Sequence, residues 1–434
     1  MHNEIKFIDL FAGMGGTRVG FEQAAKEMGM ASKCVFSSEI KEHAIEAYNN
    51  HFSGDTVSGD ITSIAPTDIP DFDYLLAGFP CQPFSSAGNR HGFMDERGGL
   101  FFTIWDILKT KKPAGFLLEN VDGLVSHDGG KTISTIMEKL IEIGYFVDFK
   151  VIDSSHFGVP QKRKRVYIVG DLSQKPIFKD VPKKTKHAKE FIDYSSSVEL
   201  DNFTTILSKK FSKKYLEGKS IKDKRGGDNN IHSWDLELKG KVTKKQRNLL
   251  SEILKKRRSK QWAENKGIDW MDGMPLTLKE IMTFIDYEAL GSDLKYLASC
   301  GYLKLEHPKE LKIINGKKIR VYKVESEKGY NIVSGKLSFP IAKIIDPNDF
   351  VPTIVATEYG KLAVATDDGV RRITITEGLK FSGFPSDYKL DTVSYRFAFD
   401  LLGNTVMPPV IKYVSQCLLE AKYVESRRAI SEVA

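Results

Sequence analysis

Cysteine is scarce in this chain of 434 residues, and its four cysteines are far apart: Cys34, Cys81, Cys300 and Cys417. The sequence has no Cys-x-x-Cys pair of the kind that binds zinc, and its spacing offers no dense disulfide framework. We therefore expect a reducing environment and no metal site.

Long apolar runs are also missing. No stretch of about 18 apolar residues occurs, which excludes a membrane-spanning helix. Residues 1–10 lack the basic segment followed by an apolar one that marks a secretory signal, so a cytoplasmic protein is expected. With 41% hydrophobic and 28% charged residues, the composition is that of a globular protein of two or three domains.

Positive charge is concentrated in the middle of the chain. Residues 171–350 hold 37 Lys and Arg against 25 Asp and Glu, whereas the remainder holds 27 against 32. The formal net charge of +7 therefore hides a basic block between mildly acidic flanks. Such a block is typical of a surface that binds nucleic acid, and a solvated lysine-rich face is the alternative.

The first third of the chain alternates apolar strand-like runs with helix-like segments. This pattern predicts an α/β fold with a mostly parallel, doubly wound sheet. Expected strands are residues 6–11, 35–39, 56–60, 74–77, 115–118, 146–152 and 166–169. In such sheets ligands bind at the carboxyl ends of the strands. The residues expected to meet there are Phe11, Glu39, Asp60, Cys81 and Glu119.

Cys81 is the candidate nucleophile. It follows the apolar strand 74–77, Gly78 permits a sharp exit, and Pro80 and Pro83 each restrict the backbone around it. A thiol would thereby be presented at the end of a strand. The alternative is a small, inert core residue, as free cysteines commonly are.

The glycine turn at residues 12–16 predicts a nucleoside-like cofactor. Gly13-x-Gly15 opens like a dinucleotide fingerprint, but the third glycine of that motif would fall on Arg18. A ribose and a flat base without phosphates fit better, and S-adenosylmethionine is such a molecule. Glu39 would bind the ribose and Asp60 the edge of the base. The apolar walls would be Phe11, Ile40, Ile61 and Leu100, for which plain core packing is the alternative.

Five motifs, taken in order, resemble those of DNA cytosine-5 methyltransferases of the bacterial type II modification kind. They are Phe7–Gly16, Gly78–Ser85, Glu119–Val121, Gln161–Tyr167 and Gly403–Val406. The resemblance covers about residues 5–171 and 350–420. It implies the S-adenosylmethionine-dependent methyltransferase fold with a separate, smaller DNA target-recognition domain. The implied boundaries are 1–171 and 351–434 for the catalytic domain and 172–350 for the recognition region.

This resemblance implies a chemistry in which a cysteine adds to carbon 6 of cytosine, so that carbon 5 can accept a methyl group. Cys81 would be that nucleophile, Glu119 the acid at ring nitrogen 3, and Arg163 and Arg165 the supporting cations. As ordinary residues, Glu119 would cap a turn and the arginines would be solvated charges. Cofactor residues expected with those above are Gly13, Gly15, Gly16, Pro80, Asn404 and Val406; the product would be S-adenosylhomocysteine.

A cytosine inside a duplex must be rotated out of the stack to reach such a site. The glycine-rich segment 84–99 is expected to close over it, with a solvated connector as the alternative. In the basic middle, helices are expected at 241–260, 276–285 and 294–300, then strands at 302–305 and 313–321 around the turn Asn315-Gly316. This order suggests a winged-helix-like unit, and a merely structural insert is the alternative.

The predicted function is sequence-specific methylation of carbon 5 of cytosine in double-stranded DNA. A transfer RNA methyltransferase of related fold and a non-catalytic DNA-binding protein are the competing hypotheses. A monomer without membrane contact is expected, and a restriction endonuclease acting on the same site, without direct binding, is a candidate partner. The sequence names neither the recognition site nor the base that removes the carbon-5 proton.

Overall fold

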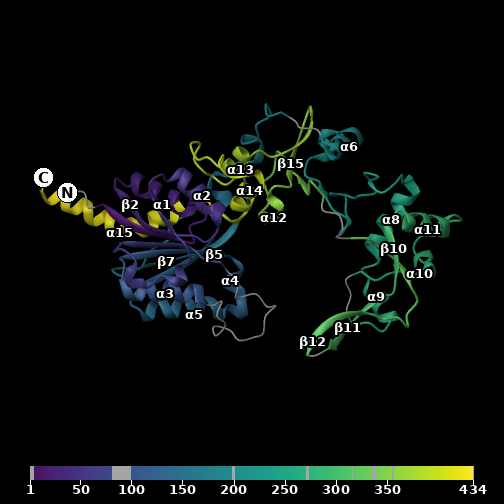
Figure 1. Cartoon of the computed structure of the whole chain (residues 1–434), viewed down its shortest axis with the longest axis horizontal. Helices are drawn as coiled ribbons and strands as arrows, with labels where there is room; N and C mark the ends of the chain where they lie inside the picture. The colour runs from purple at the N-terminus through teal and green to yellow at the C-terminus, as the bar shows by residue number, and fades with distance from the viewer. Residues whose placement is uncertain are drawn as a thin grey trace. The chain divides into compact units, whose positions relative to one another are not determined.

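The computed structural model describes residues 4–80, 99–197, 201–269, 273–314, 316–334, 339–353 and 356–433. They form two compact units (Figure 1). Unit 1 comprises Met1–Tyr194, Pro347–Gly360 and Ile373–Ala434, and unit 2 comprises Ser195–Asp346 and Lys361–Arg372. These limits differ from the expected 171/172 and 350/351 divisions, because a strand pair after residue 360 joins the sheet of unit 2. The functional boundaries remain a prediction.

Unit 1 is built on a seven-stranded sheet with the order β3-β2-β1-β4-β5-β7-β6. The first five strands are parallel, and β7 runs antiparallel to both of its neighbours. The strands are β1 (Ile5–Leu10), β2 (Ser32–Ser38), β3 (Val57–Ser58), β4 (Tyr74–Gly78), β5 (Gly115–Val121), β6 (Phe146–Asp153) and β7 (Lys164–Asp171). The expected mostly parallel sheet is confirmed.

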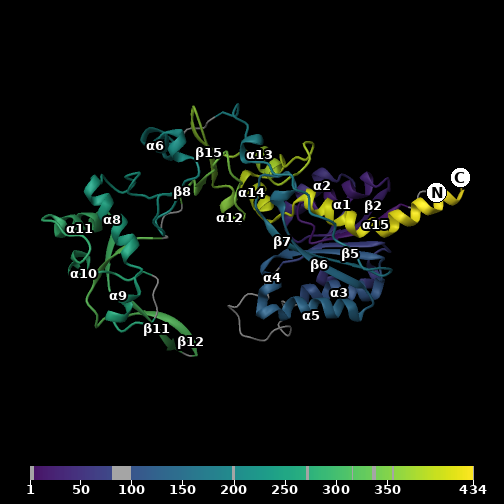
Figure 2. The same cartoon turned by 180° about the vertical axis from the view of Figure 1, so that it is seen from behind.

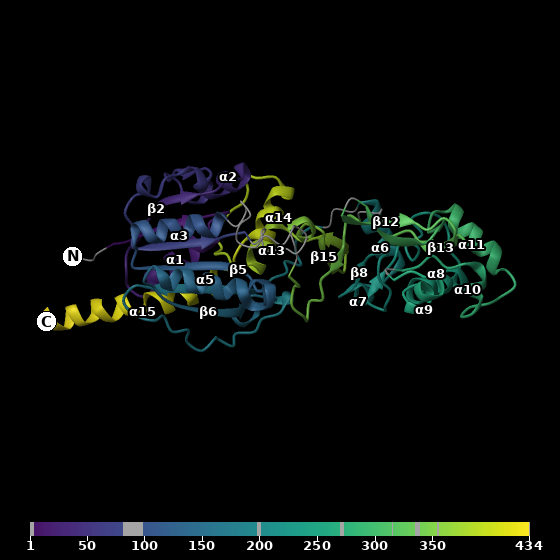
Figure 3. The ribbon, with the colours of Figure 1, turned by 90° about the horizontal axis from the view of Figure 1, so that it is seen from below.

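Helices cover both faces of this sheet because its strands are apolar on both sides. In β1, Phe7 packs with α1 and α15, whereas Ile8 and Leu10 pack with α3 and α5. Figure 2 shows the same unit from behind, and Figure 3 views it from the side of α3 and α5. The helices are α1 (Gly16–Glu27), α2 (Glu42–His51), α3 (Gly99–Lys111), α4 (Gly123–Ser126), α5 (Lys131–Glu142), α12 (Ala356–Tyr359), α13 (Ile375–Phe381), α14 (Tyr395–Asn404) and α15 (Pro408–Val433).

The C-terminal helix α15 completes the core of unit 1. It packs so closely on α1 that a Cβ at Gly20 would lie 2.5 Å from the Cβ of Ile411. Val410 and Val414 are buried against the sheet. The first part of α15, up to Leu419, therefore belongs to the same core as β1.

Unit 2 contains two hydrophobic cores. The first surrounds a five-stranded sheet of order β16-β15-β14-β8-β9, whose pairs mix parallel and antiparallel directions. Its elements are α6 (Asn202–Lys210), α7 (Lys213–Leu216), β8 (Ser220–Ile221), β9 (Asn230–Ile231), β14 (Lys343–Ile344), β15 (Leu362–Thr366) and β16 (Gly369–Arg372).

The second core is mostly helical and lies within the basic middle of the sequence. Its elements are α8 (Lys244–Lys256), α9 (Lys260–Asn265), α10 (Leu278–Met282), α11 (Leu290–Ser299), β10 (Leu303–Glu306), β11 (Lys309–Ile314), β12 (Lys317–Tyr322) and β13 (Gly329–Ile332). The expected amphipathic helix is α8, which begins at a capping box between Thr243 and Gln246. One expected helix is wrong in part: Leu276 pairs with Tyr330 of β13 instead, and α10 starts only at Leu278.

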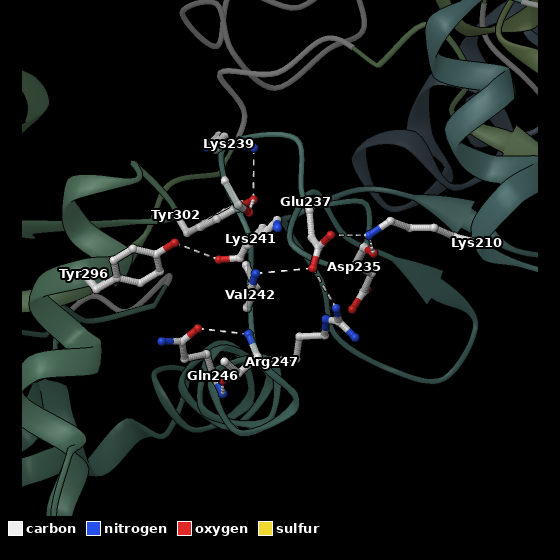
Figure 4. A network of polar contacts seen from close by, with 12 residues as sticks. Lys210, Asp235, Glu237, Lys239, Lys241, Val242, Gln246, Arg247, Tyr296 and Tyr302 are labelled. Atoms are coloured by element: carbon white, nitrogen blue, oxygen red, sulfur yellow. Dashed lines mark hydrogen bonds and ion pairs between the residues drawn. The ribbon is translucent and has the colours of Figure 1, made fainter.

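Glu237 links the two cores of unit 2 (Figure 4). Its carboxylate contacts Lys210 of α6 at 2.7 Å and Arg247 of α8 at 3.0 Å. The backbone N–H of Val242 donates to the same carboxylate at 3.3 Å. The bond from Lys210, followed by the other partners, lowers the pKa of Glu237 to about 2. The ionised side chain therefore ties the sheet core to the helical core.

No helix in the described part of the chain has the combination of length and apolarity that crossing a bilayer requires.

One carboxyl in unit 1, that of Asp9, is buried without a hydrogen-bond partner among the described residues. Asp9, in the interior strand β1, is 0% exposed, and neither of its carboxylate oxygens has such a partner in the described part of the chain. Burial raises the pKa of Asp9 well above its usual range, and the charge of Arg18 on α1 acts in the opposite direction. Burial therefore favours the neutral acid more strongly in the folded state than in the unfolded chain.

This pKa predicts how stability depends on pH. In the unfolded chain an aspartate loses its proton near pH ~3.9. Above that value the folded protein holds a proton that the unfolded chain has released, so the Asp9 contribution to stability falls as pH rises, until the folded carboxyl also ionises. Asp9→Asn should remove this slope, and urea unfolding at a series of pH values measures it. Asp71→Asn, at a side chain 96% exposed, is the control and should keep the wild-type slope.

Candidate functional site

The glycine turn that follows β1 has an unusual backbone. Phe11, Gly13 and Gly15 all have positive φ, at 55°, 54° and 80°. Glycine adopts this region without cost, but a phenylalanine there is strained and must be held by its surroundings. Gly15 is the residue that caps α1. The turn therefore leads directly from the sheet into the N-terminus of a helix.

Glu39 holds this turn in place. It directly follows β2, and its Oε2 accepts a hydrogen bond from the backbone N–H of Gly13 at 2.9 Å. Its Oε1 accepts from the N–H groups of Ile40 and Lys41 at 2.8 and 2.9 Å. The carboxylate expected to bind a ribose thus also joins the ends of two neighbouring strands.

The four residues expected to form the apolar walls differ in their exposure. Ile40 is 70% exposed, as a residue that contacts a ligand would be, whereas Ile61 is 2% exposed and belongs to the sheet core. Phe11 and Leu100 are half-buried. Asp60 caps the short helix η1 (Ile61–Ser63), because its Oδ1 accepts the N–H of Thr62 at 2.9 Å. The Ile61 side chain therefore fits the core-packing alternative.

The segment 403–406, far away in sequence, lies against both the turn and the end of β4. A Cβ at Gly16 would meet Thr405 and Val406 at 2.9 and 3.0 Å. A Cβ at Gly78, the last residue of β4, would lie 3.8 Å from Val406. Asn404 is exposed, and its amide donates to the carbonyl of Asp400 within α14.

Glu119 and Arg165 form a buried ion pair at the end of β4. Gly78 pairs with Glu119, which sits inside β5 rather than after it, because β5 continues to Val121. Arg165 Nε lies 3.0 Å from Glu119 Oε1, and the two side chains are 15% and 10% exposed. Burial raises the pKa of Glu119, and the charges of Arg165 and then Arg163 limit that rise.

Arg163 is a second buried cation beside this pair. It is 5% exposed, and its Nη1 donates to the carbonyl of Gly403 at 3.1 Å. Burial, followed by the neighbouring Arg165 charge, lowers the pKa of Arg163 to about 10. Neither arginine is the solvated surface charge that the alternative interpretation required.

Asn120 is a residue whose individual role the sequence did not reveal. Its buried amide donates to the carbonyl of Phe79 at 3.0 Å and so holds the backbone that leaves β4. Its Oδ1 accepts the N–H of Val121 at 2.8 Å. The only sequence feature that could have indicated this role is the position of Asn120 directly after the candidate catalytic carboxyl.

Cys81 and most of the expected closing segment, residues 81–98, lie outside the described residues. Pro80, the last described residue before them, is exposed. Among the described side chains, no group of three or more His, Cys, Asp or Glu is placed to hold a metal ion.

The chain matches the family model of C-5 cytosine-specific DNA methylases over residues 5–420. It is 51% identical to the type II methyltransferase M.NlaIV of Neisseria lactamica, over 96% of this chain and 99% of that protein. It is 39% identical to the type II methyltransferase M.BanI of Aneurinibacillus aneurinilyticus, over 96% of each chain.

The fold is also found among solved structures. The S. pombe Dnmt2 methyltransferase superposes with a TM-score of 0.53 at 16% identity, over 96% of this chain and 99% of that one. A putative DNA modification methyltransferase from an E. coli prophage superposes with a TM-score of 0.50 at 19% identity, with the same coverage of both chains. The methyltransferase fold is therefore confirmed. With a family match over nearly its whole length and full-length type II relatives, the chain belongs to the C-5 cytosine-specific DNA methylases and is a DNA (cytosine-5-)-methyltransferase.

Proposed function

We propose that this enzyme methylates cytosine at a specific sequence in double-stranded DNA through a covalent bond between Cys81 and a base rotated out of the helix. The observation that carries the proposal is the buried carboxyl of Glu119, paired with Arg165 at 3.0 Å beside the end of β4. Cys81 follows Gly78, the end of that strand, by three residues. A thiol and a carboxyl with raised pKa are thus drawn from neighbouring strands.

The residues at the strand ends fit S-adenosylmethionine. Glu39 keeps acceptor capacity for a ribose hydroxyl in addition to its backbone bonds, because a carboxylate has about four lone-pair sites. Ile40 offers an exposed apolar surface to a flat base. At Gly13 an added Cβ would meet no described atom within 4 Å, so the turn is open on that side. Bound there, the cofactor would supply an electrophilic methyl group.

The side chains would act on the cytosine in sequence. The Cys81 thiolate forms a bond to carbon 6, and Glu119 donates a proton or hydrogen bond to nitrogen 3, so that electron density builds at carbon 5. Carbon 5 then takes the methyl group. A base, for which water is our candidate, removes the carbon-5 proton, and the electron pair expels the cysteine as its thiolate. Any proton that Glu119 gave to nitrogen 3 returns to its carboxylate. Arg165 and Arg163 stabilise the negative charge that develops on the ring and on the carboxylate of Glu119 during these steps.

Unit 2 would bind the duplex and choose the sequence. It contains most of the basic middle of the chain, and DNA is the polyanion named by the family model that the chain matches. We also propose a monomeric enzyme and, as a cellular partner, a restriction endonuclease that acts on the same site without binding it. A dimer detected by sedimentation at micromolar protein concentration would contradict the proposal that the enzyme is a monomer.

The covalent step can be tested with a trapped base. A duplex containing 5-fluorocytosine in the target has no carbon-5 proton to lose, so the adduct cannot be released after methyl transfer. With S-adenosylmethionine present, a denaturant-resistant complex should accumulate and map to Cys81 by peptide mass spectrometry.

Cys81→Ser is the matched variant and should give no adduct and no methylation. Wild-type levels of methylation by this variant would refute the mechanism. Transfer RNA is assayed in parallel, and preferential methyl incorporation into it would favour the competing substrate. Bisulfite sequencing of methylated random-sequence DNA, with M.NlaIV as a parallel control, identifies the target.

Glu119→Gln tests the acid. We expect kcat to fall at least ~100-fold, in the range of general acid catalysis, with little change in the binding of DNA or cofactor. In the wild type, the rate should decline as pH rises through the raised pKa of Glu119, since the protonated form is the active one. That decline should be absent in the variant. Glu142→Gln, at an exposed glutamate, is the control; equal pH profiles in all three proteins would refute the role.

A further inference from the structure

The helical core of unit 2 has a strand and helix order that points to a DNA-binding module. Helix α8 is followed by the short helix α9, the pairing of Leu276 with β13, then α10, α11, β10, the hairpin β11–β12, and β13 itself. Strand β10 pairs antiparallel with β13, so the hairpin is an extension between two strands of one small sheet. This is the order of a winged helix, with the hairpin as its wing.

The hairpin extends away from the helices of its own unit (Figures 1 and 2). Its strands pair from Lys309 with Tyr322 to Ile314 with Lys317. Each strand has six residues, so the ribbon is about 20 Å long at ~3.3 Å per residue. A two-stranded ribbon of this kind fits the major groove of B-DNA, which is ~12 Å wide.

The two faces of this ribbon differ in charge. Because directly paired residues share a face, one face carries Lys309, Leu311, Ile313, Lys318, Arg320 and Tyr322. This face, which we call the cationic face, has three cations and no acidic residue. The opposite face contains Glu310, whose carboxylate pairs with Lys312 at 3.0 Å. By the same register the opposite face also holds Lys317, so the formal charge is +3 on the cationic face and +1 on the other.

A pocket at the base of the ribbon continues the cationic face. It has a volume of about 160 Å³, and both Lys309 and Arg320 line it. Its other cations are Lys224, Arg257 and Lys304, so five Lys and Arg face one carboxylate, that of Glu306. That carboxylate is already engaged: Lys304 contacts its Oε2 at 2.6 Å, and Asn331 donates to its Oε1 at 2.8 Å.

Both faces of the ribbon expose apolar side chains, and Ile313 on the cationic face is the most exposed of them. Ile313 is 72% exposed and Leu311 is 40% exposed, although burial would stabilise both. Within a DNA groove, aliphatic side chains contact the methyl group of thymine, while flanking cations contact phosphates. Charge and exposure thus agree on one occupant.

Helix α11, which takes the position of the usual recognition helix, is poorly suited to the same task. Its only cation is Lys295, and its Asp293 is held by Gln246 at 2.7 Å and by Tyr287 at 2.7 Å. The exposed Tyr296 donates its hydroxyl hydrogen to the carbonyl of Lys241.

We propose that the β11–β12 hairpin, rather than α11, is the main DNA-contacting element of this module. Its cationic face and the pocket at its base bind phosphates, and Leu311 and Ile313 contact base edges in the groove. This inference rests on the proposed function, in which unit 2 binds the duplex. It assigns that binding to one element of unit 2.

The test is a binding measurement that needs no catalysis. Fluorescence anisotropy of a labelled target duplex is followed over a range of salt concentrations for the double variant Lys309→Ala/Lys318→Ala. The Kd should rise about tenfold or more near 0.15 M salt, and the slope of log Kd against log salt should fall by about 2, one for each lost phosphate contact. Thermal unfolding and cofactor binding should stay at wild-type values.

Two single variants are the matched controls. Lys312→Ala removes a lysine from the opposite face of the same strand, and Lys295→Ala removes the only cation of α11. Both should bind with wild-type affinity and salt slope. Wild-type binding by the double variant, or weakened binding by Lys295→Ala alone, would overturn the proposal.

Ile313→Ser tests the groove contact separately. It should change the relative methylation of substrates that differ by single base pairs, while leaving the salt slope unchanged. An unchanged preference would overturn the base-contact part. If the wild type binds duplex DNA but methylates none, the proposed function fails and the hairpin result still stands; if it methylates and the hairpin variants behave as wild type, only this inference fails.

Discussion

The ion pair between Glu119 and Arg165 is the interaction on which the candidate site depends. A carboxyl in this position is buried, and burial alone would favour its neutral form. The nearby cation opposes this effect without removing it. The proposed role of Glu119 as an acid requires a carboxyl that can hold a proton and release it, and a raised pKa favours the protonated form.

The antiparallel strand β7 makes this arrangement available. In the β5–β7 ladder Glu119 pairs with Tyr167, so Arg165, two residues along, lies on the same face. The strand pairing therefore brings Glu119 and Arg165 together. Arg163, which directly precedes β7, adds a side-chain hydrogen bond to the carbonyl of Gly403 in the C-terminal segment.

The glycine turn and unit 2 show two further constraints. Glu39 joins the ends of β1 and β2 through backbone N–H groups, and Phe11 accepts a strained conformation next to it. In unit 2, Glu237 links the two hydrophobic cores. The described residues of the β11–β12 hairpin belong to neither core. The two cores thus form a base from which the basic β11–β12 hairpin extends, as a ribbon that binds a duplex must.

The sequence by itself determined the kinds of elements, their order and the family. Apolar spacing distinguishes strands from helices locally, and five ordered motifs are a specific signal. Only the tertiary structure decided which side chains meet. It buried Ile61 in the core, gave Asn120 a role at the exit of β4, paired Leu276 with β13, and placed both arginines inside unit 1. Burial and partner choice depend on residues that are distant in sequence, and no local pattern contains that information.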